Sequence, residues 1–169
     1  MSIDYFASRV WRIFSMLAFG ISLLFIYRGL PDPTAVHFGE TGRGDGFLPK
    51  EEVFYLVAGI STLLNVLALL LIKSIEKIPT EKWSQILAIF AEKGNGAIKS
   101  IFVNWLHFFP AIINTYLILV MRSLLMLNDE RTNQTDYSYL PALGIVFLLL
   151  WLIYLPIRLF TSPKFEEEL

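Results

Sequence analysis

The sequence predicts an all-α membrane protein with four transmembrane helices, and two observations carry that prediction. Of the 169 residues, 55% are hydrophobic and only 17% are charged, whereas a soluble domain holds about a quarter charged residues. Three stretches contain no charged residue: 53–72, 100–121 and 137–157. Each is long enough to cross a hydrocarbon layer of ~30 Å at a rise of ~1.5 Å per residue.

The first span is the least obvious, because its uncharged stretch, 13–27, is short and follows Arg9 and Arg12. A secretory signal peptide can look similar, but no small-x-small cleavage site follows this stretch. Arg12 can extend its side chain to the interface, which lengthens the span. We therefore expect one membrane domain over 1–169 with transmembrane helices at about 8–28, 53–72, 100–124 and 138–160.

The distribution of positive charge predicts the orientation. Nine of the 14 Lys and Arg residues lie in the N-terminus, the 73–99 segment and the C-terminal tail, and five lie in the other two loops. Loops on the cytoplasmic side carry the excess of positive charge. We therefore expect a multi-pass protein of the bacterial cytoplasmic (inner) membrane with both termini in the cytoplasm, so that residues 29–52 form an external loop.

Composition excludes several classes of function. The absence of cysteine excludes disulfides, iron–sulfur clusters, thiolate zinc sites and covalently attached haem. The net charge is −1 with no basic run, so nucleic acid is not an expected partner. His37 has carboxylates nearby but no Ser or Cys partner, so we predict no catalytic residues, no metal site and no cofactor, and a protein that is not an enzyme.

The segment between the second and third spans predicts a cytoplasmic amphipathic helix at about 80–93, with Thr80 as its N-cap and Gly94 after its end. The apolar face at i, i+3, i+4 and i+7 consists of Trp83, Ile86, Leu87 and Phe90. Such a helix lies flat on the membrane interface. It is either a surface anchor or a docking element for a cytoplasmic partner.

Polar residues inside the spans are the next candidates, because burying them in lipid is costly unless they have a role. Asn104, His107 and Asn114 share one face of the third span at ~100° per residue. Counting depth from the cytoplasmic side places Asn65 of the second span level with His107, which predicts a hydrogen bond between them. This cluster is either interhelical packing or a site for a ligand such as a quinone or lipid headgroup, and Pro110 is expected to kink the helix beside it.

The external loop has the strongest local patterning. Residues 34–38 are rich in β-branched and aromatic side chains and predict a short extended strand. The Gly-rich stretch around Asp45-Gly46 predicts tight turns. We expect a compact hairpin-like cap in which His37 and Asp45 hydrogen-bond within the loop.

This loop resembles the conserved external loop of the SdpI-like family of bacterial membrane proteins. The matching positions are Leu30, Pro31, Asp32, His37, Phe38, Gly42, Asp45, Gly46 and Lys50. The chain departs from the family pattern at Ala35, Gly39 and the Arg43-Gly44 pair. The resemblance covers about residues 28–52 and the flanking helices, and it implies a multi-helix inner-membrane protein. Its best-understood members confer immunity to a secreted toxin and sequester a transcriptional repressor at the membrane.

From these observations we expect a non-enzymatic membrane protein that acts through protein–protein contacts. It is either an SdpI-like immunity or sensor protein, or a small accessory subunit of a larger membrane complex. The expected partners are membrane lipids and either other membrane subunits or a secreted or periplasmic protein. The alternative is a membrane enzyme, a transporter, or a subunit that binds a quinone or lipid through the polar cluster around His107.

Overall fold

The computed structural model describes residues 3–39, 43–131, 136–137 and 139–162. Within these ranges, four helices are long enough and apolar enough to cross a membrane, which confirms the four predicted spans. They are α1 (Ile3–Gly29), α2 (Lys50–Glu76), α4 (Asn95–Leu127) and α5 (Leu140–Thr161). The first three exceed the predicted spans because charged turns at their ends continue the helix instead of ending it.

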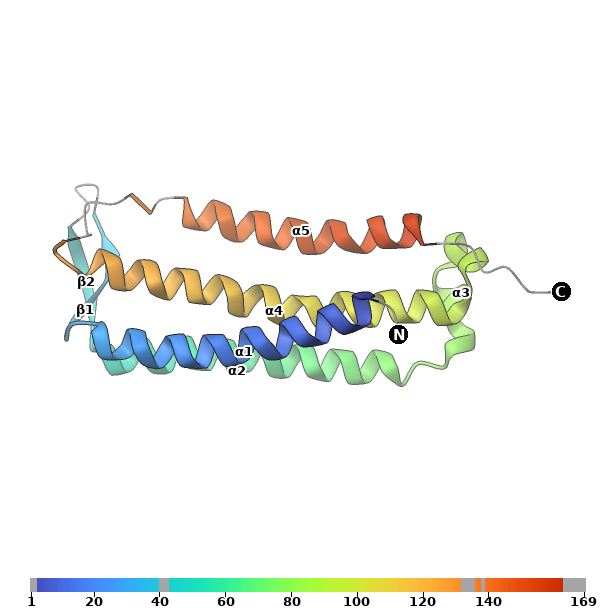
Figure 1. Cartoon of the computed structure of the whole chain (residues 1–169), viewed down its shortest axis with the longest axis horizontal. Helices are drawn as coiled ribbons and strands as arrows, with labels where there is room; N and C mark the ends of the chain where they lie inside the picture. Colours follow the sequence, from blue (N-terminus) through green and yellow to red (C-terminus); the bar gives the residue numbers. More distant parts are fainter. Residues whose placement is uncertain (1–2, 40–42, 132–135, 138, 163–169) are drawn as a thin grey trace.

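Helix α4 is the centre of the bundle and packs against α1, α2 and α5. Figure 1 shows that α1 runs parallel to α4, whereas α2 and α5 run in the opposite direction. A two-stranded sheet covers one end of the bundle, here called the hairpin end. Residues 77–94, here called the connector, lie at the other end, the connector end.

The apolar core is unevenly distributed between the two ends. Toward the hairpin end, three helices share one buried cluster, formed by Phe19, Leu23, Ile26, Leu30, Val53, Val57 and Met121. Toward the connector end, the buried cluster consists of Ile72, Val103 and Leu106, which come from α2 and α4 alone. At that end, α1 contacts α4 through the side chains of Arg9 and Arg12 and through the ring of Trp11, which meets Phe108.

Residues 34–38 form a strand, as the sequence predicts, whereas the Asp45-Gly46 pair, predicted to form a tight turn, lies within a second strand. Strand β1 (Thr34–Phe38) pairs antiparallel with β2 (Gly44–Leu48), with register shifts on either side of His37. A Cβ atom added at Gly44 would lie 2.6 Å from the Cβ of Ala35, and one at Gly46 would lie 2.9 Å from the Cβ of His37. These two glycines are required because the facing strand approaches too closely for any side chain.

The connector corrects the prediction of one amphipathic helix over 80–93, which is wrong. It contains a 3₁₀ turn at Thr80–Lys82, a short helix α3 (Trp83–Ile86) and a second 3₁₀ segment at Ala88–Lys93. Pro79, not Thr80, occupies the N-cap position, and the helix breaks at Leu87, whose φ of −126° and ψ of 63° are not helical.

Contacts with the bundle explain why the connector does not follow its sequence periodicity. The Trp83 side chain is buried against the ring of Phe102, with ring centroids 5.3 Å apart. Ile86, predicted on the same face, is exposed, whereas Phe90 contacts the ring of Phe160. The predicted apolar face is thus divided between α4, α5 and the surroundings.

Two lysines fasten the connector end by binding the C-terminal carbonyl groups of helices. The ammonium of Lys99 donates to the carbonyl oxygens of Glu76 at 2.8 Å and Ile78 at 2.9 Å, at the end of α2. The buried Lys93 donates to the carbonyl oxygens of Phe160 and Ser162 at the end of α5. A positive charge at this position also complements the negative end of the helix dipole.

Candidate functional site

One face of α4 carries a line of buried polar side chains, here called the polar seam. Asn104, His107 and Asn114, which the helix period places on one face, are 3%, 5% and 0% exposed. Their partners come from two different helices, so the seam has two parts. Toward the connector end it faces α1, and near the middle of the bundle it faces α2.

The part that faces α1 pairs two arginines with two neutral side chains. Arg9 donates from Nη1 to Oδ1 of Asn104 at 2.9 Å, and Arg12 lies with Nη1 2.9 Å from Nδ1 of His107. Arg9 also stacks on the ring of Tyr5, with its guanidinium carbon 3.6 Å from the ring centroid. The two arginines are three positions apart on α1, so they occupy adjacent positions on one side of the helix.

The chemistry of the Arg12–His107 contact fixes the protonation of the histidine. A guanidinium offers only donors, so Nδ1 of His107 must act as the acceptor. A histidine whose Nδ1 accepts a hydrogen bond is neutral and carries its proton on Nε2. In this contact His107 orients Arg12 and does not neutralise its charge.

The part that faces α2 is a compact amide network. The amide nitrogen of Asn65 donates to Oδ1 of Asn114 at 2.9 Å, and the hydroxyl of Ser61 donates to the same oxygen at 3.0 Å. Asn114 in turn donates to Oδ1 of Asn65 at 3.3 Å. Every group in this network has a partner, which is the arrangement expected of interhelical hydrogen bonds within a membrane.

The predicted Asn65–His107 hydrogen bond is wrong, because α2 and α4 are not level at the connector end. Ile72, near the end of α2, packs against Val103 and Leu106. The first turns of α4 therefore lie beyond the level at which α2 ends, as Figure 1 also shows. This offset moves Asn65 along the bundle to Asn114 and leaves His107 to α1.

The hairpin is joined to the bundle by side chains at three points. Oδ1 of Asn128 accepts from the backbone N–H of Ala35 at 2.8 Å, and its amide nitrogen donates to the Ala35 carbonyl at 2.9 Å. Asp32 accepts from the backbone N–H of Lys50, the first residue of α2, at 3.3 Å. Leu30 is buried in the core beneath the hairpin.

The remaining loop-motif residues lie on or near this cap. His37 and Asp45 hydrogen-bond to each other across the strands, as the sequence predicts, and both are largely exposed. Lys50 lies over the ring of Tyr27 at 5.4 Å. Pro31 lines a hollow between the end of α1 and the end of α4, whereas Gly42 falls outside the residues that the structure describes.

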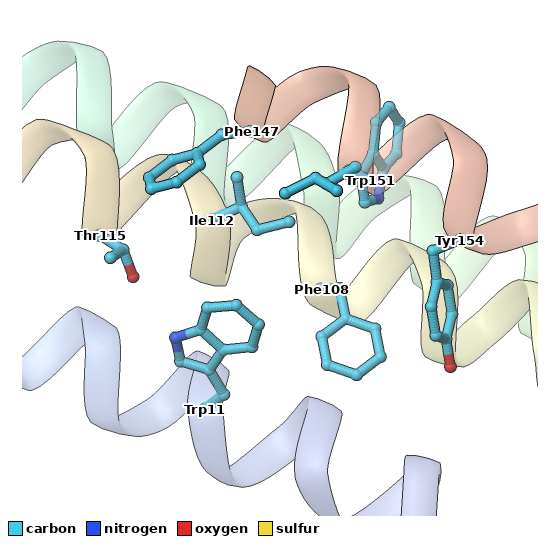
Figure 2. A pocket seen from close by; sticks show the side chains of 8 residues that line it. Trp11, Phe108, Ile112, Thr115, Phe147, Trp151 and Tyr154 are labelled. Atoms are coloured by element: carbon cyan, nitrogen blue, oxygen red, sulfur yellow. The ribbon is translucent and has the colours of Figure 1, made fainter. Parts of the chain in front are cut away.

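An aromatic cavity of about 350 Å³ lies between α1, α4 and α5, and no pattern in the sequence predicts it. Figure 2 shows Trp11 pointing from α1 toward Phe108 of α4, with side chains of α5 on the far side. The lining residues are Trp11, Phe108, Ile112, Thr115, Phe147, Leu150, Trp151 and Tyr154. Because these helices meet only in the folded bundle, spacing along the sequence gives no sign of the cavity.

Arg9 and Arg12 are not recognisable as site residues from the sequence alone. Arg12 is expected to extend to the interface, but both arginines turn toward α4. One feature of the sequence could have indicated the contact. Arg9 and Arg12 are three positions apart, as are Asn104 and His107 on the parallel helix α4.

Comparison with known proteins found no matching protein family, no similar curated protein and no similar solved structure.

Proposed function

We propose that the chain is a non-enzymatic protein of the bacterial inner membrane that acts through protein–protein contacts, with the hairpin as its extracytoplasmic contact surface. The observation that carries this proposal is the attachment of the hairpin to two helices, through Asn128–Ala35 and Asp32–Lys50. A surface that is ordered before binding loses less conformational entropy when a partner binds.

The exposed side chains of the hairpin suit protein recognition. Val36 and Phe47 are 39% and 55% exposed, although both are large and apolar. The exposed His37–Asp45 pair supplies polar groups beside them. Apolar anchors surrounded by polar groups are typical of protein interfaces.

Two roles fit this surface. In an SdpI-like immunity or sensor protein, the hairpin would meet a secreted toxin or peptide. In an accessory subunit, it would meet the external part of a neighbouring membrane protein. Deletion in the native host separates the roles: sensitivity to a secreted toxin supports the first, and loss of a stoichiometric complex supports the second.

Site-specific photo-crosslinking tests the contact surface directly. A photoreactive amino acid at Phe47 is expected to form a defined crosslinked band in the native host. The matched control replaces Leu56, which has the same 55% exposure but lies on the transmembrane part of α2. A band at both positions, or at neither, would contradict a contact surface located on the hairpin.

The second candidate function is binding of a small ligand at the polar seam, and one observation favours it. Arg9 and Arg12 bring two positive charges to Asn104 and His107 within a helix bundle. Ionised side chains at such positions commonly serve a ligand or ion. Replacement of His107 by phenylalanine distinguishes a ligand site from interhelical packing: a packing role predicts lower stability alone, and a ligand site predicts a specific loss of ligand binding.

A further inference from the structure

The arginines at the connector end of α1 retain hydrogen-bonding capacity. In the part of the chain that the structure describes, the recorded hydrogen bonds of Arg9 and Arg12 all start from Nη1. A guanidinium carries five N–H donors in a planar fork. The Nε and Nη2 donors of each arginine are therefore left for another acceptor.

Neither arginine has a recorded ion pair with another described residue. Among the described residues, the recorded salt bridges are His37–Asp45, Arg131–Asp129 and Arg158–Asp4. Asp4, the acid nearest to Arg9 on α1, is thus bound to Arg158 of α5. Glu76 acts on Arg12 through space without an ion pair, and Lys99 adds positive charge at the same end.

The partners on α4 make this a built site. Asn104 and His107 are more than nine-tenths buried, and each holds one Nη1 in place. Both partners are neutral, so they orient the guanidinium groups and leave the charge uncompensated. Two oriented guanidiniums next to each other match an acceptor with several negative oxygens, because a phosphate can accept bidentate hydrogen bonds from arginine.

We propose that Arg9 and Arg12, oriented by Asn104 and His107, form a binding site for a phosphate group at the connector end of the bundle. Large apolar residues of α1 are exposed on both sides of the two arginines, at positions 3, 6 and 10 and at positions 13, 14, 16 and 17, so the site adjoins an exposed apolar surface. The phosphate can come from an anionic phospholipid headgroup or from a soluble phosphate. This inference specifies the ligand class of the second candidate function and is independent of the role proposed for the hairpin, which lies at the opposite end.

Native mass spectrometry tests the site on the full chain purified in a neutral detergent. The protein is offered equal amounts of phosphatidylglycerol and phosphatidylcholine. The wild type is expected to retain phosphatidylglycerol in at least roughly tenfold preference, since each arginine near an anionic surface contributes to affinity. The R9Q/R12Q double variant is expected to lose that preference.

A matched control and a conservative variant separate binding from folding. Arg122→Gln removes an exposed arginine from the other end of α4 and is expected to leave the preference unchanged. The R9K/R12K variant keeps both charges but lacks the planar fork, so it is expected to fold and to retain only part of the preference. Addition of inorganic phosphate identifies the source of the phosphate group. If inorganic phosphate displaces phosphatidylglycerol, the site also binds soluble phosphate. If it does not, the site binds the phospholipid headgroup.

Equal retention of the two lipids by the wild type, without binding of inorganic phosphate, would overturn the proposal. A preference of the same size in R9Q/R12Q would do so as well. If R9Q/R12Q does not fold, the salt dependence of the wild type is the test. Its preference for phosphatidylglycerol should fall as the salt concentration rises, and a preference that does not change with salt contradicts a charge-based site.

Discussion

Trp105 and Trp151 bind each other reciprocally across the α4–α5 interface. The indole N–H of Trp105 donates to the backbone carbonyl of Trp151 at 2.8 Å, and that of Trp151 donates to the carbonyl of Trp105 at 2.9 Å. The rings are stacked, with centroids 4.2 Å apart. Because α5 packs against α4 and presents a largely exposed apolar surface, this pair is a principal attachment of α5 to the bundle.

Replacement of Trp151 by phenylalanine should loosen α5. The variant loses one interhelical hydrogen bond and the optimal stacking, which together are worth about 1–2 kcal/mol. A lower midpoint of thermal unfolding in detergent is expected. Trp11→Phe is the control, because Trp11 makes an edge contact with Phe108 and has no recorded hydrogen bond among the described residues. Equal effects of the two substitutions would argue against a special role for the reciprocal pair.

Asn65 and Asn114 should be energetically coupled. The single variants Asn65→Leu and Asn114→Leu each leave the remaining amide without its main partner, whereas the double variant removes both. We expect a coupling free energy of about 0.6–2 kcal/mol from a double-mutant cycle of unfolding in detergent. The pair Asn65 and His107, which make no mutual hydrogen bond, should show none. Coupling in the second pair instead would mean that the helices are aligned differently.

Asn128 should control the stability of the hairpin rather than that of the bundle. Asn128→Ala removes both hydrogen bonds to Ala35, each worth about 0.5–1.5 kcal/mol. Hydrogen exchange of the Ala35 amide is expected to become faster while helix amides in the core stay protected. Asn128→Asp keeps an acceptor for that amide and should have a smaller effect. Unchanged exchange in the alanine variant would show that other contacts hold the hairpin.

Asp129, at the hairpin end of α4, should titrate at an unusually low pH. Arg131 donates hydrogen bonds to its carboxylate from the side chain and the backbone, which lowers the pKa of Asp129 below its ordinary value. The pKa in the folded state is then below that in the unfolded state, so the stabilisation is present above the unfolded value of ~3.9 and is lost as pH falls through the folded value. NMR titration of the carboxyl should show this, and Arg131→Gln should raise the midpoint. A midpoint unaffected by that substitution would contradict the ion pair.

The four spans and the hairpin could be predicted because their signals are local. Uncharged stretches of sufficient length identify the helices, and the β-branched and aromatic residues at 34–38 identify the first strand of the hairpin. The hydrogen bond between His37 and Asp45 followed from the same loop. In each case the residues that make the structure lie close together in the sequence.

The partners in the polar seam could not be predicted, because they depend on how far each helix is displaced along its neighbour. The sequence placed Asn104, His107 and Asn114 on one face, but it gave no measure of the offset between α2 and α4. The prediction of one helix in the connector failed for a related reason. Burial of Trp83 against Phe102 overrides the helical periodicity of this segment. Contacts between distant segments decide both features.

The orientation of the bundle is the central claim, since the proposed hairpin interface requires the hairpin to lie outside the cytoplasm. The chain contains no cysteine, so single cysteines can be introduced cleanly at Val36 in β1 and at Glu81 in the connector. Intact spheroplasts are treated with a membrane-impermeant thiol reagent, and permeabilised cells serve as the control for reactivity. Labelling is expected at position 36 in intact spheroplasts and at position 81 only after permeabilisation. Labelling at position 81 but not 36 in intact spheroplasts would contradict it.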